Sequence, residues 1–138
     1  MRSSQYSGVT SSSVCRSSLA ALLISTSHPP RRSISWHLGL EDLTLYQIAK
    51  AGIEGLTRSL ARELGRDNIR VTTIVPGNVQ TPRQAKWYTP EGEDKIVAAQ
   101  CLDGRIQPAD VAALALFLAS DDARLCTAHE YFVDAGWR

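Results

Sequence analysis

A tyrosine and a lysine four residues apart are the side chains of this chain best suited to do chemistry. Tyr46 and Lys50 fall in a run that continues to Gly65 with apolar residues at helical spacing. Residues four apart on a helix project on one side and lie close enough to interact. An ammonium group beside a phenol favours the phenolate and lowers the phenol pKa from about 10. The pair alone is weak evidence, because many helices carry such a pair by chance.

The helix that positions this pair is predicted to run from Thr44 to Gly65. Thr44 is the expected N-cap, because its hydroxyl can accept a hydrogen bond from an amide of the first turn. Gly65 suits a left-handed residue that ends the helix. The predicted apolar stripe consists of Ile48, Ala49, Ile53, Leu56, Leu60 and Leu64.

Strands and further helices follow at regular intervals. Residues 69–75 are rich in β-branched side chains, which is typical of a buried parallel strand, and Pro76-Gly77 ends it. A loop over residues 78–90 precedes a short helix around 91–101, a second helix over 108–119 and a last strand over 130–133. This alternation predicts an α/β fold with a parallel sheet.

Composition sets broad bounds on the class of protein. The chain has 138 residues and a net charge of +1, with 43% hydrophobic and 21% charged residues, which is typical of one globular domain. The near-neutral charge gives no reason to expect nucleic acid or a membrane surface as a partner. The apolar run at 19–24 is far too short to span a bilayer.

The cysteines and histidines argue against a disulfide framework and against a metal site. Cys15, Cys101 and Cys126 are odd in number and unclustered, which suits a reducing cytosol, so we expect a cytoplasmic location. Neither His37 nor His129 has a cluster of cysteines or carboxylates at ligand spacing, so no metal is expected.

Several short motifs occur in an order that is more specific than any one of them. They are Ser33, Tyr46-x-x-x-Lys50, Asn68-Ile69-Arg70-Val71, Pro76-Gly77-Asn78-Val79-x-Thr81 and Val133-Asp134-Ala135-Gly136. Together they resemble the C-terminal half of a short-chain dehydrogenase/reductase over residues 33–138. Within that family, the strings at 33–38, 81–84, 98–102 and 134–137 resemble NAD-dependent aldose dehydrogenases, including those that act on D-xylose.

The resemblance implies a doubly wound parallel sheet of the Rossmann type, with the N-terminal dinucleotide-binding half missing from this sequence. By the same resemblance, Tyr46 is the base that takes a hydroxyl proton, and Lys50 tunes Tyr46 and holds the nicotinamide ribose. Ser33 orients the reacting oxygen. The implied contacts to the cofactor are Tyr46, Lys50, Pro76, Gly77, Val79 and Thr81, and the candidates for the substrate pocket are Ser35, Trp36, His37, Asn78 and Trp87.

The implied reaction is the NAD-linked oxidation of the C1 hydroxyl of an aldose such as D-xylose to its lactone, with NADP left open as the cofactor. The resemblance also implies a homo-oligomer, a tetramer in most family members, and makes Trp137 a candidate interface residue. Two alternatives remain. One is a 3-oxoacyl thioester reductase of the same family, and the other is a non-catalytic remnant that only associates with intact relatives.

The sequence departs from the family pattern in three ways. Gly8 and Gly39 are the only glycines before the helix, so the Gly-rich turn that meets the pyrophosphate does not occur, nor does the residue that selects NAD or NADP. Ala128 and Ala135 stand where glycines are common, which puts the geometry of the closing strand in doubt.

The third departure is the first segment. Residues 1–40 contain no Asp or Glu and are rich in serine, and residues 28–32 carry two prolines and two arginines where the family has a buried strand. A targeting peptide, a disordered tail and a non-native start are the three explanations. We favour a non-native start, of the kind that a shifted reading frame leaves, and expect residues 1–32 to be atypical and 33–138 to form the dehydrogenase-like domain.

Overall fold

The centre of the molecule is a sheet of three parallel strands. The computed structural model describes residues 19–24, 41, 43–82, 86 and 88–137, with only the backbone of 19–24. The strands β1 (Leu19–Ile24), β2 (Ile69–Pro76) and β3 (Glu130–Val133) lie in the order β1-β2-β3, and both pairs are parallel. The predicted α/β class is therefore confirmed, as are the two strands predicted at 69–75 and 130–133.

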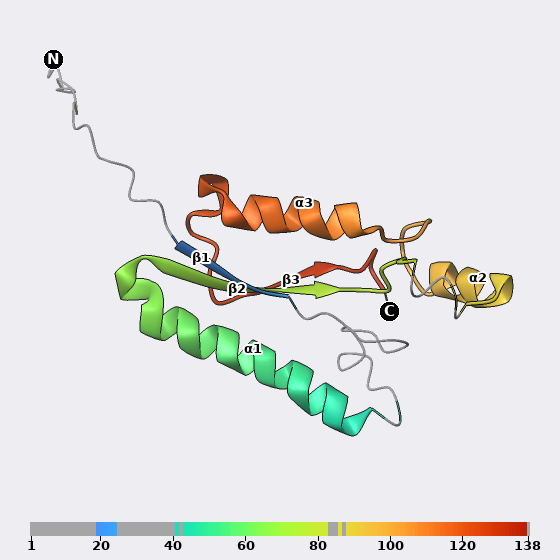
Figure 1. The fold of residues 1–138 in the computed structure, drawn as a ribbon, viewed down its shortest axis with the longest axis horizontal. Helices are drawn as coiled ribbons and strands as arrows, with labels where there is room; N and C mark the ends of the chain where they lie inside the picture. The colour runs from blue at the N-terminus through green and yellow to red at the C-terminus, as the bar shows by residue number, and fades with distance from the viewer. Residues whose placement is uncertain (1–18, 25–40, 42, 83–85, 87, 138) are drawn as a thin grey trace, which may run out of the picture.

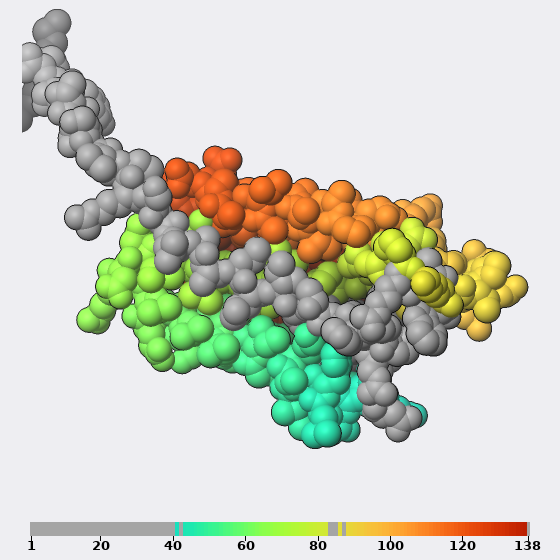
Figure 2. All heavy atoms as spheres, in the orientation of Figure 1, coloured from blue at the N-terminus to red at the C-terminus, as the bar shows by residue number. Residues whose placement is uncertain are grey.

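Two helices cover the two faces of this sheet. Helix α1 (Thr44–Leu64) lies on one face and α3 (Pro108–Ala119) on the other (Figure 1). Helix α2 (Pro90–Ala98) projects at one end, beyond the layers formed by α1 and α3 (Figure 2). Short 3-10 turns, η2 (Gly65–Asp67) and η3 (Asp121–Ala123), follow α1 and α3. None of the helices in the described ranges is long and apolar enough to cross a membrane.

Strand β1 was not predicted from the sequence. Its backbone pairs with β2 from Leu19 opposite Ile69 to Ile24 opposite Ile74. A short apolar run bounded by polar residues is compatible with a buried parallel strand, but the acid-free, Ser-rich surroundings outweighed that signal. The rest of residues 1–32 lies outside the described residues, so the proposed boundary at residue 32 stays a prediction.

The core forms around β2, which is buried from Arg70 to Pro76. Successive side chains of a strand point to opposite faces, so β2 serves both helices. Ile74 packs with Leu118 of α3 and Ala123, while the hydroxyl of Thr73 is hydrogen-bonded to that of Thr57 on α1. The two layers are thus joined by an apolar contact on one face and a polar contact on the other.

A buried arginine of the middle strand, Arg70, donates hydrogen bonds to carbonyl groups at the C-terminal end of α3. The Nη1 of Arg70 donates to the carbonyl of Leu118 at 2.6 Å, and its Nη2 donates to the carbonyl of Ser120 at 3.2 Å. The last carbonyls of a helix have no partner within the helix. Arg70 supplies two of these partners from the sheet and so fixes the position of α3 over β2.

Both predicted ends of α1 need correction. The helix begins at Thr44 itself, its N-cap is Leu43, and no side chain caps it. Gly65 has a right-handed backbone (φ −62°), because the chain continues through η2 before turning, and Asn68 is the left-handed residue (φ 61°). Asparagine tolerates this conformation better than most residues other than glycine.

The predicted apolar stripe of α1 is also offset from the face that is buried. Ile48 and Leu56 are 62% and 47% exposed, whereas Thr57 and Ala61 are buried against β2. Counting apolar residues missed this face because Thr57 is polar. Its hydroxyl is satisfied locally, by donation to the carbonyl of Ile53 at 2.8 Å, so it can be buried.

Candidate active site

The site predicted from the sequence lies at the carboxyl end of the parallel strands. Pro76 ends β2, and Gly77 follows it directly. Helix α1 runs opposite to the strands, so its first turns lie toward the end at which the arrow of β2 points (Figure 1). Ligands of open α/β sheets bind beyond this edge.

Tyr46 and Lys50 are brought together on α1 as the spacing predicts. The Nζ of Lys50 lies 5.3 Å from the centroid of the Tyr46 ring, and both side chains are half-buried. The hydroxyl oxygen of Tyr46 is buried and has no hydrogen-bond partner among the described residues. Buried polar groups without a partner are rare in native structures, and a ligand is one explanation.

The electrostatics of this pair differ from the expectation. Burial raises the pKa of Tyr46 to about 12, and burial also lowers the pKa of Lys50. The predicted decrease of the phenol pKa by Lys50 is therefore wrong for the chain on its own. The physical reason is that desolvation disfavours the phenolate, while the ammonium lies by the ring and is not hydrogen-bonded to the hydroxyl.

The segment after β2 follows a path that only glycine permits at its start. A Cβ at Gly77 would lie 2.8 Å from Cα of Asp134 and 2.9 Å from Cδ1 of Ile106. Beyond it, the amide of Val79 donates to the carbonyl of Gly77 at 3.1 Å, and the amide of Gln80 donates to the carbonyl of Ile106 at 2.7 Å. The backbone of residues 77–80 is therefore held close against the segment that precedes α3.

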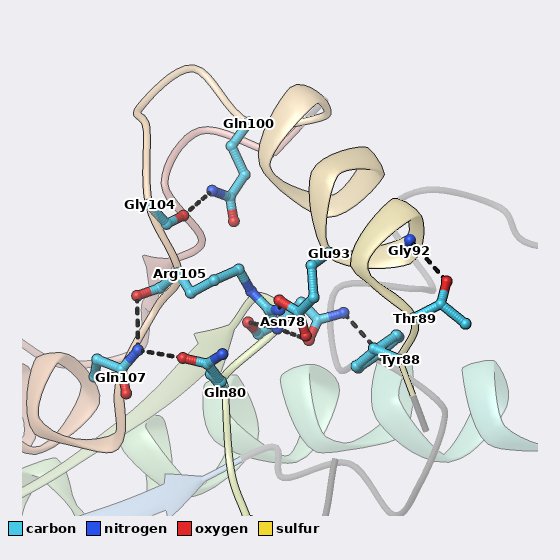
Figure 3. Close-up of polar contacts among 10 residues, drawn as sticks. All are labelled: Asn78, Gln80, Tyr88, Thr89, Gly92, Glu93, Gln100, Gly104, Arg105 and Gln107. Atoms are coloured by element: carbon cyan, nitrogen blue, oxygen red, sulfur yellow. Dashed lines mark hydrogen bonds and ion pairs between the residues drawn. The ribbon is translucent and has the colours of Figure 1, made fainter. Parts of the chain in front are cut away.

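A polar cluster anchors the same segment from the side (Figure 3). Asn78 is 1% exposed, its Nδ2 donates to the Tyr88 hydroxyl at 3.0 Å, and its Oδ1 accepts from Nη2 of Arg105 at 2.9 Å. Arg105 also forms an ion pair with Glu93 of α2. These side chains occupy the polar groups of Asn78 within the chain, and its proposed contact with a substrate stays a prediction.

Sequence reasoning did not find the roles of Tyr88, Glu93 and Arg105. Asn78 and Arg105 are 27 residues apart, and no periodic pattern connects them. The only local signal was the position of Tyr88 within the loop predicted over residues 78–90.

The remaining predicted residues fall into two groups. Pro76, the last residue of β2, is followed directly by the segment that contains Gly77, Val79 and Thr81, as expected from their spacing. Ser33, Ser35, Trp36, His37 and Trp87 lie outside the described residues. Trp137 is 5% exposed and packs on Ile96, so its suggested role at an interface is wrong for a side chain buried within its own chain.

Comparison with known proteins adds an independent line of evidence. A family model described as enoyl-(acyl carrier protein) reductase matches residues 31–138. The chain is 78% identical over 106 residues to a D-xylose 1-dehydrogenase of Caulobacter vibrioides, covering 77% of this chain and 43% of that protein. It is 43% identical over 105 residues to a protein of Rhizobium meliloti named probable galactose dehydrogenase, covering 75% of this chain and 41% of that protein.

Solved structures show the same relationship. A 7α-hydroxysteroid dehydrogenase complexed with NADH and 7-oxo glycochenodeoxycholic acid aligns with a TM-score of 0.73 and 30% identity, covering 86% of this chain and 44% of that chain. The chain thus spans less than half the length of the relatives it matches.

Proposed function

Since the chain belongs to the short-chain dehydrogenase/reductase family, we propose that it serves in the NAD-linked oxidation of an aldose, such as D-xylose, at its C1 hydroxyl to give the lactone. The observation that carries the proposal is the buried hydroxyl of Tyr46 beside Lys50, which has no hydrogen-bond partner among the residues that the structure describes. The choice of a sugar as substrate rests on the 78% identity to a D-xylose 1-dehydrogenase.

In this proposal, Tyr46 takes the proton of the substrate hydroxyl and Lys50 stabilises the resulting charge distribution. Ser33 orients the reacting oxygen. NAD, when bound, would supply the acceptor for the hydride. Burial raises the pKa of Tyr46 to about 12, so the phenol is rarely ionised at neutral pH in the chain on its own.

The residues present fit one end of the cofactor. The unpartnered Tyr46 hydroxyl and the Lys50 ammonium offer hydrogen bonds to a nicotinamide ribose, and the segment Pro76–Thr81 lies at the same end of the sheet. The Gly-rich turn that would meet the pyrophosphate does not occur in the 138 residues. We therefore propose that this chain provides the nicotinamide side of the site, and that other residues hold the rest of the cofactor. The cofactor is proposed to be NAD, with NADP still open.

Titration of the purified chain with NADH, followed by quenching of tryptophan fluorescence, tests cofactor binding. Turnover is then measured with D-xylose, D-glucose and a 3-oxoacyl thioester, which separates a sugar dehydrogenase from a thioester reductase. We expect Tyr46→Phe to lower turnover about 100-fold or more, beyond any loss of NADH affinity that follows from the missing ribose hydrogen bond. Tyr131→Phe, at a partly buried tyrosine packed against the cluster of Ile74, is the matched control.

Absence of binding by a folded chain would contradict the proposal for this chain. Turnover by Tyr46→Phe equal to that of the unmutated protein would contradict the role of the tyrosine while leaving the family assignment intact.

An uncovered apolar face on α1 supports the expected association between chains. Ile48 and Leu56 lie largely exposed on this helix, together with Leu45. Exposed apolar patches of this kind mark interaction surfaces. Homo-oligomer formation, as a tetramer, is therefore part of the proposal, and it is also what the non-catalytic alternative predicts. Light scattering of the chain and of Ile48→Lys tests association, while only the Tyr46→Phe comparison tests catalysis.

A further inference from the structure

Arg105 joins three segments that are distant in the sequence. Its Nη2 donates to Oδ1 of Asn78 at 2.9 Å and to the Asn78 carbonyl at 3.4 Å, while its Nη1 is paired with Glu93 of α2. The centre of its guanidinium lies 5.6 Å from the centroid of the Tyr88 ring. Figure 3 shows these side chains converging between α2 and the segment after β2. We call Asn78, Tyr88, Glu93 and Arg105 the Arg105 cluster.

The cluster is buried enough for its geometry to matter. The side chain of Arg105 is 9% exposed and that of Glu93 is 27% exposed. A desolvated ion pair adds little net stability, because the cost of removing both charges from water offsets their attraction. Its effect is to set geometry, since the planar guanidinium presents fixed donors to two partners at once.

Val79 is held on both sides by this region. Before it, Asn78 is bonded to Arg105. After it, Oε1 of Gln80 accepts from Nε2 of Gln107 at 2.9 Å. The backbone of Val79 itself forms a parallel bridge with Ile106. The segment 105–107 therefore holds residues 78–80 in place through two side-chain hydrogen bonds and one backbone bridge.

We propose that Arg105 is a positioning residue that fixes the backbone around Val79 for the nicotinamide and couples its position to α2. The inference rests on the proposed function, because residues 76–81 are the segment proposed to meet the nicotinamide. In this role Arg105 acts through Asn78. Without the Arg105 guanidinium, the segment 78–80 and α2 can move independently of each other.

Two measurements on the 138-residue chain test this role. The first is hydrogen exchange at the Gln80 amide, which reports the bond to Ile106 directly. The second is the Kd for reduced nicotinamide mononucleotide, a probe that needs only the nicotinamide side of the site. For Arg105→Gln we expect faster exchange at Gln80 and a Kd raised about tenfold, because small misplacement of a contact is costly.

Further variants separate positioning from general stability. Arg105→Lys keeps the positive charge but loses the planar guanidinium and its fixed donors. We therefore expect it to restore neither the slow exchange at Gln80 nor the Kd of the unmutated chain. Glu93→Gln keeps the shape and is the milder variant should Arg105→Gln fail to fold. Tyr88→Phe keeps the ring and is expected to have a smaller effect. Arg124→Gln, an exposed arginine outside the cluster, is the matched control and should change nothing.

The outcomes distinguish this inference from the proposed function. Unchanged Gln80 exchange in a folded Arg105→Gln or Glu93→Gln chain overturns the positioning role, whether or not a ligand binds. Full rescue by Arg105→Lys also overturns it, since charge alone would then suffice. Failure of the unmutated chain to bind the mononucleotide counts against the proposed function, and the exchange comparison still decides the role of Arg105 in holding the loop.

Discussion

The Nζ of Lys50 lies 5.3 Å from the centroid of the Tyr46 ring, and the Tyr46 hydroxyl accepts and donates no hydrogen bond within the described part of the chain. The ammonium therefore contacts the ring of the tyrosine while the hydroxyl remains buried and unpaired. Desolvation dominates in this arrangement, and the phenol holds its proton more tightly than a free tyrosine does.

A pH dependence of stability follows from this geometry. The pKa of Tyr46 is about 12 in the folded chain and about 10 in an unfolded one, so the folded state is favoured while the phenol is protonated. This contribution is present below pH of about 10 and is lost as the pH rises toward about 12. We expect urea unfolding of Tyr46→Phe to depend less on pH in this window.

Tyr131, whose pKa burial also raises to about 12, provides the comparison. Tyr131→Phe should reduce the same dependence, and the double variant should reduce it further. An unfolding free energy of Tyr46→Phe that falls with pH as steeply as that of the unmutated chain would contradict the assignment.

The buried contact between Thr57 and Thr73 predicts a non-additive pair of substitutions. Thr57 donates its one hydroxyl proton to the carbonyl of Ile53, so Thr73 must be the donor between the two hydroxyls. Thr57→Val leaves the Thr73 hydroxyl buried without an acceptor, and we expect a loss of about 1–3 kcal/mol in unfolding free energy. The double variant with Thr73→Val should be less destabilised than the sum of both changes.

Urea denaturation of the two single variants and the double variant measures this coupling. Thr57→Ser, which keeps the hydroxyl, is the control. Strict additivity would mean that the two hydroxyls do not depend on each other.

Two glycines of the chain are predicted to respond in opposite ways to the same substitution. A Cβ at Gly77 meets the backbone of Asp134 at 2.8 Å, whereas a Cβ at Gly55 in α1 meets nothing within 4 Å. Gly77→Ala is expected to cost about 1–3 kcal/mol because the backbone must shift. Gly55→Ala is expected to stabilise by up to about 1 kcal/mol through helix propensity. Equal midpoints of thermal unfolding for the two variants would argue against the close approach at Gly77.

The two alanines at positions where the family commonly has glycine both adopt left-handed backbones. Ala128 has φ of 62° and Ala135 has φ of 54°. A left-handed conformation costs alanine roughly 1 kcal/mol or more relative to glycine, partly offset by the greater freedom of glycine in the unfolded chain. Ala128→Gly and Ala135→Gly should each stabilise the protein by roughly 0.5–1 kcal/mol in denaturant unfolding. Ala112→Gly, on the exposed side of α3, should instead destabilise it by about 1 kcal/mol.

Local patterns in the sequence were sufficient for the helices and strands after residue 43 and for the family, but not for strand β1. The helix that carries Tyr46 and Lys50 and the strands at 69–75 and 130–133 are recognisable because periodicity and β-branched runs are properties of neighbouring residues. The order of short motifs indicated the family. Ala128 and Ala135, at positions where glycines are common, put the geometry of the closing strand in doubt, and the structure shows that both have left-handed backbones.

Other features depend on contacts between residues that are far apart in the chain, and only the tertiary structure decided them. Burial of Tyr46 reverses the expected change in its pKa, because desolvation depends on everything packed around the phenol. The inward face of α1 carries Thr57, whose hydroxyl is hydrogen-bonded to that of Thr73 on β2, 16 residues further along the chain. Arg105 reaches Asn78 across 27 residues, and no pattern within a helix or a strand encodes that distance.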